Sequence, residues 1–177
     1  MTSRPLLNLT NNERRRWKKI QEFAFSHATP GRQVTNFFWR QSVEAFDRGA
    51  FLCSSILAGI TAELAHKTRL KEQGVEMKEK DGRPKMWGRL IQCDEKDEDI
   101  KKIAIEIKDR YRNVWAHPDY EEIKVYLKRR GASVWSDVAM NFAFASADLK
   151  PLELTRDLLA GLFGQASTWK HSGSDKR

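Results

Sequence analysis

The sequence is poor in cysteine, and this scarcity excludes several protein classes. Its 177 residues include two cysteines, Cys53 and Cys93, which form neither a CxxC pair nor a metal-ligand spacing. A disulfide framework is therefore excluded, and a reducing cytoplasm is the expected location. Cys53 lies in an apolar run, so we expect it to be a small core residue.

Long apolar runs and common cofactor motifs are also missing. The opening stretch MTSRPLLNLTNN has no apolar segment that could act as a secretory signal. The most apolar segment, residues 51–65, is shorter than the roughly 20 residues that span a bilayer, so we interpret it as a buried helix with no membrane partner. There is no phosphate loop, no GxGxxG and no GxSxG motif, and we predict no cofactor.

Apolar residues and positive charge are abundant. Apolar residues make up 40% of the chain and include six Trp and nine Phe, which argues for one folded domain rather than disorder. The formal net charge is +8. Such an excess favours a polyanionic partner such as nucleic acid, although a basic protein without one is the alternative.

Hydrophobic spacing predicts an all-α fold, an antiparallel bundle of about five to seven helices. Thr10 and Glu13 fit a capping box that starts the first helix. Further helices are expected over 33–47, 50–72, 87–92, 94–117 and 120–131, and from Pro151 onward. In the helix over 33–47 we expect an inward face of Val34, Phe37, Phe38, Val43 and Phe46. Residues 9–168 would form one domain with a flexible loop at 74–86, between disordered ends at 1–8 and 169–177.

The stretch RYRNVWAHP holds the candidate chemistry. On an ideal helix Arg110, Asn113 and His117 share one stripe, and Arg112 lies about 140° from His117. Pro118 should end the helix. Histidine can exchange protons near neutral pH, and arginine can bind a phosphate as its charge grows, which suits metal-free RNA cleavage. The alternative is an ordinary helix end, where Arg and His stabilise the free carbonyls.

This stretch resembles the signature of the HEPN superfamily, which is Arg, four to six residues, then His. Arg112, followed by the polar Asn113 and separated by four residues from His117, fits the pattern, and Arg110 is a possible substitute. The helix pair SVEAFDRGAFLCSSILAGITAELAHK is similar to the pair that precedes the motif in that family. The resemblance covers roughly residues 35–165.

The resemblance implies a metal-independent endoribonuclease that acts as a homodimer and leaves 2′,3′-cyclic phosphate ends. His117 would be the general acid or base, Arg112 would stabilise the transition state, and Asn113 would orient His117 or the phosphate. Such enzymes serve as toxins, with a possible antitoxin partner, or as effectors in phage-defence complexes. In one subgroup of the family, a tyrosine two residues after the motif histidine is modified. Tyr120 lies three residues after His117 and does not match that spacing.

Other residues were weighed for binding roles. Glu63 and His66 form Glu-x-x-His, but no second copy completes an iron site, so no metal is predicted. We expect Glu63 instead to be a partly buried acceptor for Arg110 or Arg112. Basic side chains that would guide RNA are Arg110, Arg14, Arg15, Lys128, Arg129 and Arg130.

Two further functions remain open. One is a non-catalytic HEPN-like module that binds nucleic acid, a nucleotide or a protein partner. The other is a DNA-binding protein, although no helix-turn-helix motif is apparent. An enzyme needs Arg112 and His117 side by side and open to solvent, whereas a binding module tolerates either residue buried or held in an ion pair.

Overall fold

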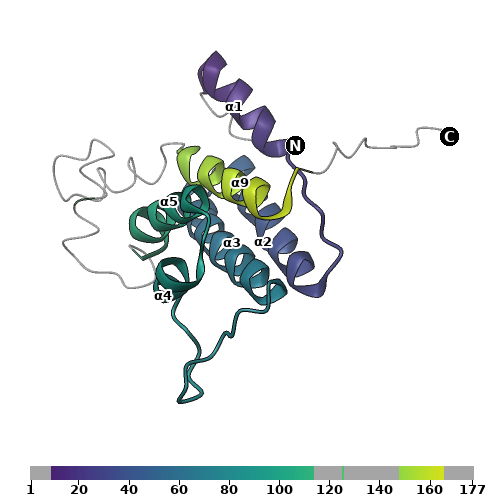
Figure 1. The fold of residues 1–177 in the computed structure, drawn as a ribbon. Coiled ribbons are helices and arrows are strands. Elements are labelled where there is room, and N and C mark those ends of the chain that lie inside the picture. The colour runs from purple at the N-terminus through teal and green to yellow at the C-terminus, as the bar shows by residue number, and fades with distance from the viewer. Residues whose placement is uncertain (1–8, 114–124, 126–147, 166–177) are drawn as a thin grey trace.

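The computed structural model describes residues 9–113, 125 and 148–165, and in these parts of the chain the fold is all-α, as predicted (Figure 1). An isolated bridge between Lys78 and Pro84 is the one β-type pairing among them. The helices are α1 (Asn11–Gln21), α2 (Pro30–Asp47), α3 (Phe51–Glu72), α4 (Trp87–Arg89), α5 (Glu98–Ile107) and α9 (Lys150–Phe163). Two π-helical turns, η1 (Leu90–Asp94) and η2 (Lys108–Arg112), follow α4 and α5.

Helix α3 is the centre of the bundle. It packs against α2, α5, η2 and α9. Figure 1 shows α2, α5 and α9 around it. Small side chains along α3, such as Ala58, Ala62 and Ala65, are fully buried and let the neighbouring helices come close. Thr155 of α9 donates a hydrogen bond to the carbonyl oxygen of Ala58 at 3.2 Å. The prediction that residues 51–65 form a buried helix is therefore confirmed.

Helix α1 begins at the capping box predicted from the sequence. The Glu13 carboxylate accepts hydrogen bonds from the backbone N–H and the hydroxyl of Thr10, both at 2.8 Å. The apolar side of α1 contacts the bundle through Trp17, whose ring centroid lies 4.6 Å from that of Phe46. Its basic side is fixed at one point, where Arg16 donates to Glu153 of α9 at 2.6 Å.

The predicted inward face of α2 is partly wrong. Phe46 is buried, but Val34 is 49% exposed and Phe37 is 58% exposed. The buried stripe is instead Thr35, Trp39, Ser42 and Phe46. Thr35 and Ser42 satisfy their hydroxyls on backbone carbonyls of α2 itself, so they can lie at a close helix contact that larger side chains could not enter. Cys53, expected in the core, is also exposed.

Residues 73–86 are non-helical, as predicted, and contain a tight hairpin. The N–H of Glu79 donates to the carbonyl of Arg83 at 2.7 Å, and the N–H of Lys85 donates to that of Met77 at 2.9 Å. Gly82 turns the chain at a φ of 83°, where a side chain would be strained. The hairpin leads into α4 and η1, which bury Trp87, Leu90 and Ile91.

Several predictions lie outside the described residues. They concern the helix at 120–131, apart from Val125, and the terminal segments 1–8 and 169–177. Among the helices that the structure describes, none combines the length and apolar character needed to cross a membrane.

Candidate functional site

The motif is preceded by a change of helix type. Asp97 caps α5 by accepting from the N–H groups of Asp99 and Ile100, and α5 continues regularly to Ile107. Lys108–Arg112 then form a π-helical turn. Such a turn holds more residues than an α-helical turn, and it recurs at functional sites. The ideal-helix step of 100° therefore does not hold within η2, and the positions predicted relative to His117 lie outside the described residues.

Arg112 turns toward the central helix α3. Its Nε donates to Oε2 of Glu63 at 2.9 Å, and its Nη1 lies 3.5 Å from Oδ1 of Asn113. The second oxygen of Glu63 accepts from Nζ of Lys67 at 2.6 Å. The side chain of Arg112 is 25% exposed. The contact predicted between Glu63 and a motif arginine is therefore present, and the arginine is Arg112.

Gly59 makes this approach possible. A Cβ built at Gly59 would lie 3.1 Å from Cβ and 3.3 Å from Cα of Arg112, which is tighter than most side-chain contacts. Gly59 and Glu63 are four residues apart, so they lie on one face of α3. Together they form a socket in which the backbone of η2 sits on the glycine and the guanidinium reaches the carboxylate. The spacing Gly-x-x-x-Glu in α3 is the sequence signal for this socket, and it was missed.

Arg110 has different surroundings. Its side chain is 58% exposed and pairs with Glu106, one turn earlier, at 3.1 Å. Exposed pairs of this kind contribute little to stability. The structure thus separates the two candidate arginines, placing Arg112 against the bundle and Arg110 on its surface.

The remaining motif residues are only partly described. Asn113 continues the helix beyond η2, with φ −69° and ψ −38°, and its side-chain oxygen faces Arg112. The other predicted site residues lie outside the described part of the chain: His117, Tyr120, Lys128, Arg129 and Arg130. The structure therefore brings together Glu63, Arg112 and Asn113.

No family match accompanies this geometry. Comparisons of the chain with protein-family models, with curated proteins and with solved structures found no match. The HEPN resemblance consequently rests on the motif, its position after α5 and the helix pair before it. The ribonuclease function that this resemblance implies stays a prediction.

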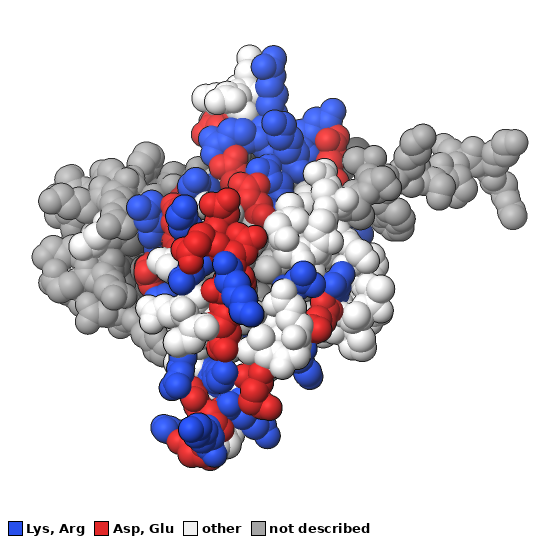
Figure 2. All heavy atoms as spheres, in the orientation of Figure 1, with Lys and Arg blue, Asp and Glu red and all other residues white. Residues whose placement is uncertain are grey.

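A basic surface covers the exposed side of α1. Figure 2 shows Lys and Arg gathered over this helix, with a band of Asp and Glu below them. Arg14, Arg15, Lys18 and Lys19 are exposed, and Arg15 and Lys19 have no carboxylate partner among the described residues. Lys18 and Lys19 lie in the last turn, where cations interact favourably with the helix dipole. We call these four residues the α1 basic face.

His66, weighed above as part of an iron motif, is buried in a hydrogen-bonded chain. Its Nδ1 accepts from the indole Nε1 of Trp87 at 3.1 Å, and its Nε2 lies 2.7 Å from Oε2 of Glu95. Because indole can only donate, Nε2 must carry the imidazole proton and donate to Glu95. Within the described residues no group of His, Cys, Asp and Glu could hold a metal ion.

The environment of His66 favours its neutral form. Burial lowers the pKa of His66, and the nearby carboxylates of Glu95 and Asp94 oppose this shift without cancelling it. Protonation would also place a hydrogen on Nδ1, which would remove the acceptor of the Trp87 indole. The hydrogen bonds that join Trp87, His66 and Glu95 therefore require a neutral imidazole.

Stability is expected to decrease on mild acidification. The folded-state pKa of His66 lies below its unfolded value, so its contribution is fully present above the unfolded pKa and is lost as pH falls toward the folded one. Urea unfolding at about pH 7.5 and about pH 5.5 should show a smaller free energy of unfolding at the lower pH. In His66→Leu this decrease should be smaller. An equal decrease in both proteins would contradict the assignment to His66.

Proposed function

We propose that this protein is a metal-independent endoribonuclease of the HEPN type that acts as a homodimer. The observation that carries the proposal is the way Arg112 is held. Glu63 binds its Nε, while among the described residues the Nη groups meet no carboxylate and make only the long contact with Asn113. An arginine fixed at one edge is positioned to offer the other edge to a phosphate.

The charge balance around Arg112 supports the same function. Glu63 is shared between Arg112 and Lys67, so the three side chains keep a net positive charge. A cleaved RNA phosphate gains negative charge in the transition state, and a fixed cation stabilises that charge more than it stabilises the ground state. Glu63 therefore positions Arg112 without neutralising the site.

The reaction needs a base, an acid and the substrate's own nucleophile. The RNA 2′-oxygen attacks phosphorus, His117 of one chain accepts the 2′-proton, and the 5′-oxygen leaves with a proton from a second acid. The motif offers one histidine per chain, so His117 of a second chain supplies that acid in a homodimer. The products are a 2′,3′-cyclic phosphate and a free 5′-hydroxyl. Asn113 orients His117 or the phosphate.

The basic residues guide the substrate. The α1 basic face is exposed and has few carboxylate partners, so it attracts the phosphate backbone whatever the sequence. Arg110, Lys128, Arg129 and Arg130 add to this attraction. A cytoplasmic RNA target fits a role as a toxin or a phage-defence effector, with an antitoxin or defence-complex protein as a further partner.

A non-catalytic HEPN-like module is the second candidate, and one observation favours it. The guanidinium of Arg112 is already ion-paired and is only 25% exposed. In a binding module this pair would serve to fasten η2 to α3, and the exposed basic residues would contact nucleic acid or a protein partner. The two candidates share the fold and differ in whether Arg112 meets a reacting phosphate.

The test is cleavage of single-stranded RNA and tRNA in the presence of EDTA. The purified dimer should cut RNA without metal, leave 2′,3′-cyclic phosphate ends, and fail at a cleavage site that carries a single 2′-deoxy substitution. This matched substrate removes only the nucleophile. Cleavage that requires Mg²⁺, or that continues at the deoxy site, would contradict the proposed mechanism. Tight RNA binding without cleavage by the folded dimer would favour the binding module.

A further inference from the structure

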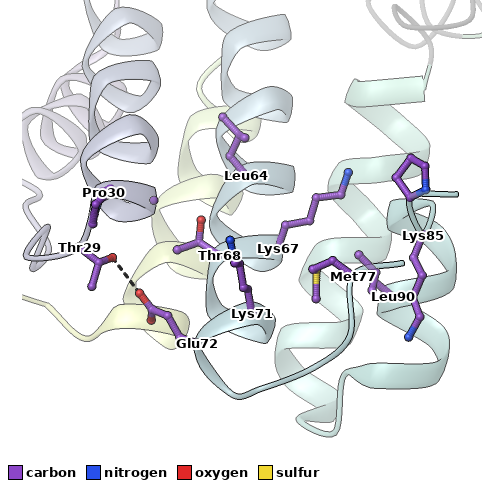
Figure 3. A pocket seen from close by; sticks show the side chains of 12 residues that line it. Thr29, Pro30, Leu64, Lys67, Thr68, Lys71, Glu72, Met77, Lys85 and Leu90 are labelled. Carbon is purple, nitrogen blue, oxygen red and sulfur yellow. Dashed lines mark hydrogen bonds between the residues drawn. The ribbon is translucent and has the colours of Figure 1, made fainter. Parts of the chain in front are cut away.

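A pocket of about 580 Å³ lies between α2, α3 and the hairpin, and its lining includes Lys67, which donates to Glu63 of the Arg112 site. Figure 3 shows Thr29 and Pro30 on one side, the last turns of α3 in the middle, and Met77, Lys85 and Leu90 on the other side. Pockets of roughly 300–1,000 Å³ are typical of small-molecule sites. Three separate segments build this pocket, so its shape depends on the complete fold.

The lining combines an apolar surface with amines. Leu64, Met77, Pro84 and Leu90 supply apolar contact area. Lys67, Lys71 and Lys85 also line the pocket, and their aliphatic stems extend its apolar wall. This combination suits a ligand with an apolar body and a negatively charged group.

Most charges around the pocket already have partners. Lys67 donates to Glu63 at 2.6 Å, and Lys85 lies 3.3 Å from Asp94. The one acid in the lining, Glu72, accepts from Arg32 at 2.6 Å and from the Thr29 hydroxyl at 2.9 Å. Arg32 lowers the pKa of Glu72, so this carboxylate stays charged, and its hydrogen bonds are made with Arg32 and Thr29.

Lys71 is the exception. No carboxylate partner of its amine occurs among the described residues, and it is exposed at the pocket beside Thr68. A neutral ligand that covered Lys71 would remove water from an unpaired cation, which costs free energy. The ligand that fits therefore carries a negative charge that can meet Lys71.

We propose that this pocket binds a small organic anion, whose acid group pairs with Lys71 and whose apolar body packs on Leu64, Met77 and Leu90. The Thr68 hydroxyl lines the same wall and can donate to the acid group. Probe binding does not require RNA cleavage, so it can be measured whether or not the chain proves to be a nuclease.

The test uses two fluorescent probes that differ in one group. Anilinonaphthalenesulfonate has an aromatic body and one sulfonate, and phenylnaphthylamine has the same rings without the sulfonate. We expect saturable binding of the sulfonate to the full-length protein at one site per chain. Lys71→Gln should weaken sulfonate binding about five- to tenfold, the value of one partly screened charge-assisted hydrogen bond. It should leave phenylnaphthylamine binding within about twofold.

Two further variants test the charge pairing and the location of the probe. Lys80→Gln removes the same charge from an exposed position on the hairpin that does not line the pocket, and it should bind both probes as the wild type does. Met77→Trp fills the pocket and should weaken both probes at least about tenfold. Equal sulfonate affinity in Lys71→Gln and Lys80→Gln would overturn the charge pairing. Unchanged binding in Met77→Trp would place the probe elsewhere and overturn the site.

Discussion

Replacing Arg112 with alanine is expected to lower the rate of RNA cleavage by about 10²–10³-fold, the usual cost of losing one transition-state donor. Replacing Arg110 with alanine should change the rate by less than about threefold, because Arg110 is exposed and paired with Glu106 of its own helix. Both variants remove one arginine from the same π-helical turn. Their difference therefore reports the position of the side chain and not the loss of charge.

Single-turnover cleavage of a labelled RNA in EDTA measures this effect. Arg112→Lys keeps the charge but loses the planar fork that reaches Glu63 through Nε and, in the proposed reaction, would bind a phosphate through Nη. It should therefore also be strongly impaired. His117→Ala, prepared in parallel, identifies any contaminating nuclease, because true activity should disappear in it. A larger loss in Arg110→Ala than in Arg112→Ala would show that Arg110 is the motif arginine.

Replacing His66 with alanine is expected to lower the free energy of unfolding by about 3–5 kcal/mol. The variant loses a fully buried ring and leaves a cavity. It also leaves the Trp87 indole N–H without its acceptor, and Oε2 of Glu95 loses the donor that His66 provides. These losses come together because one imidazole links α3 to both α4 and the residue that follows η1.

Urea denaturation followed by circular dichroism measures this loss, with His27→Ala as the matched control. His27 is an exposed histidine in the segment between α1 and α2, so its replacement should change stability by less than about 0.5 kcal/mol. In a chain of this size the His66 variant should lower Tm by about 2–4 °C for each kcal/mol lost. If the His66→Ala protein is as stable as the His27→Ala protein, the hydrogen bonds of His66 with Trp87 and Glu95 make no net contribution to the free energy of unfolding.

Helix positions were predictable where the signal is local. The Thr10 and Glu13 capping box lies within four residues, and the start of α1 follows from it. The apolar run of α3 and the first-turn proline of α9 are signals of the same kind. The inward face of α2 was not predictable in this way. Two hydroxyl residues are buried there while Phe37 is exposed, and this outcome depends on how closely α3 approaches.

The sequence by itself determined the all-α class, the start of α1 and the chemical groups of the motif, because caps and periodicity act over a few residues. Only the tertiary structure decided which arginine meets Glu63. That contact joins residues 49 positions apart. It needs a π-helical turn to rotate Arg112 inward and a glycine at position 59 to admit its backbone. Gly59 stands in the sequence, but which side chain lies against it depends on how η2 packs on α3.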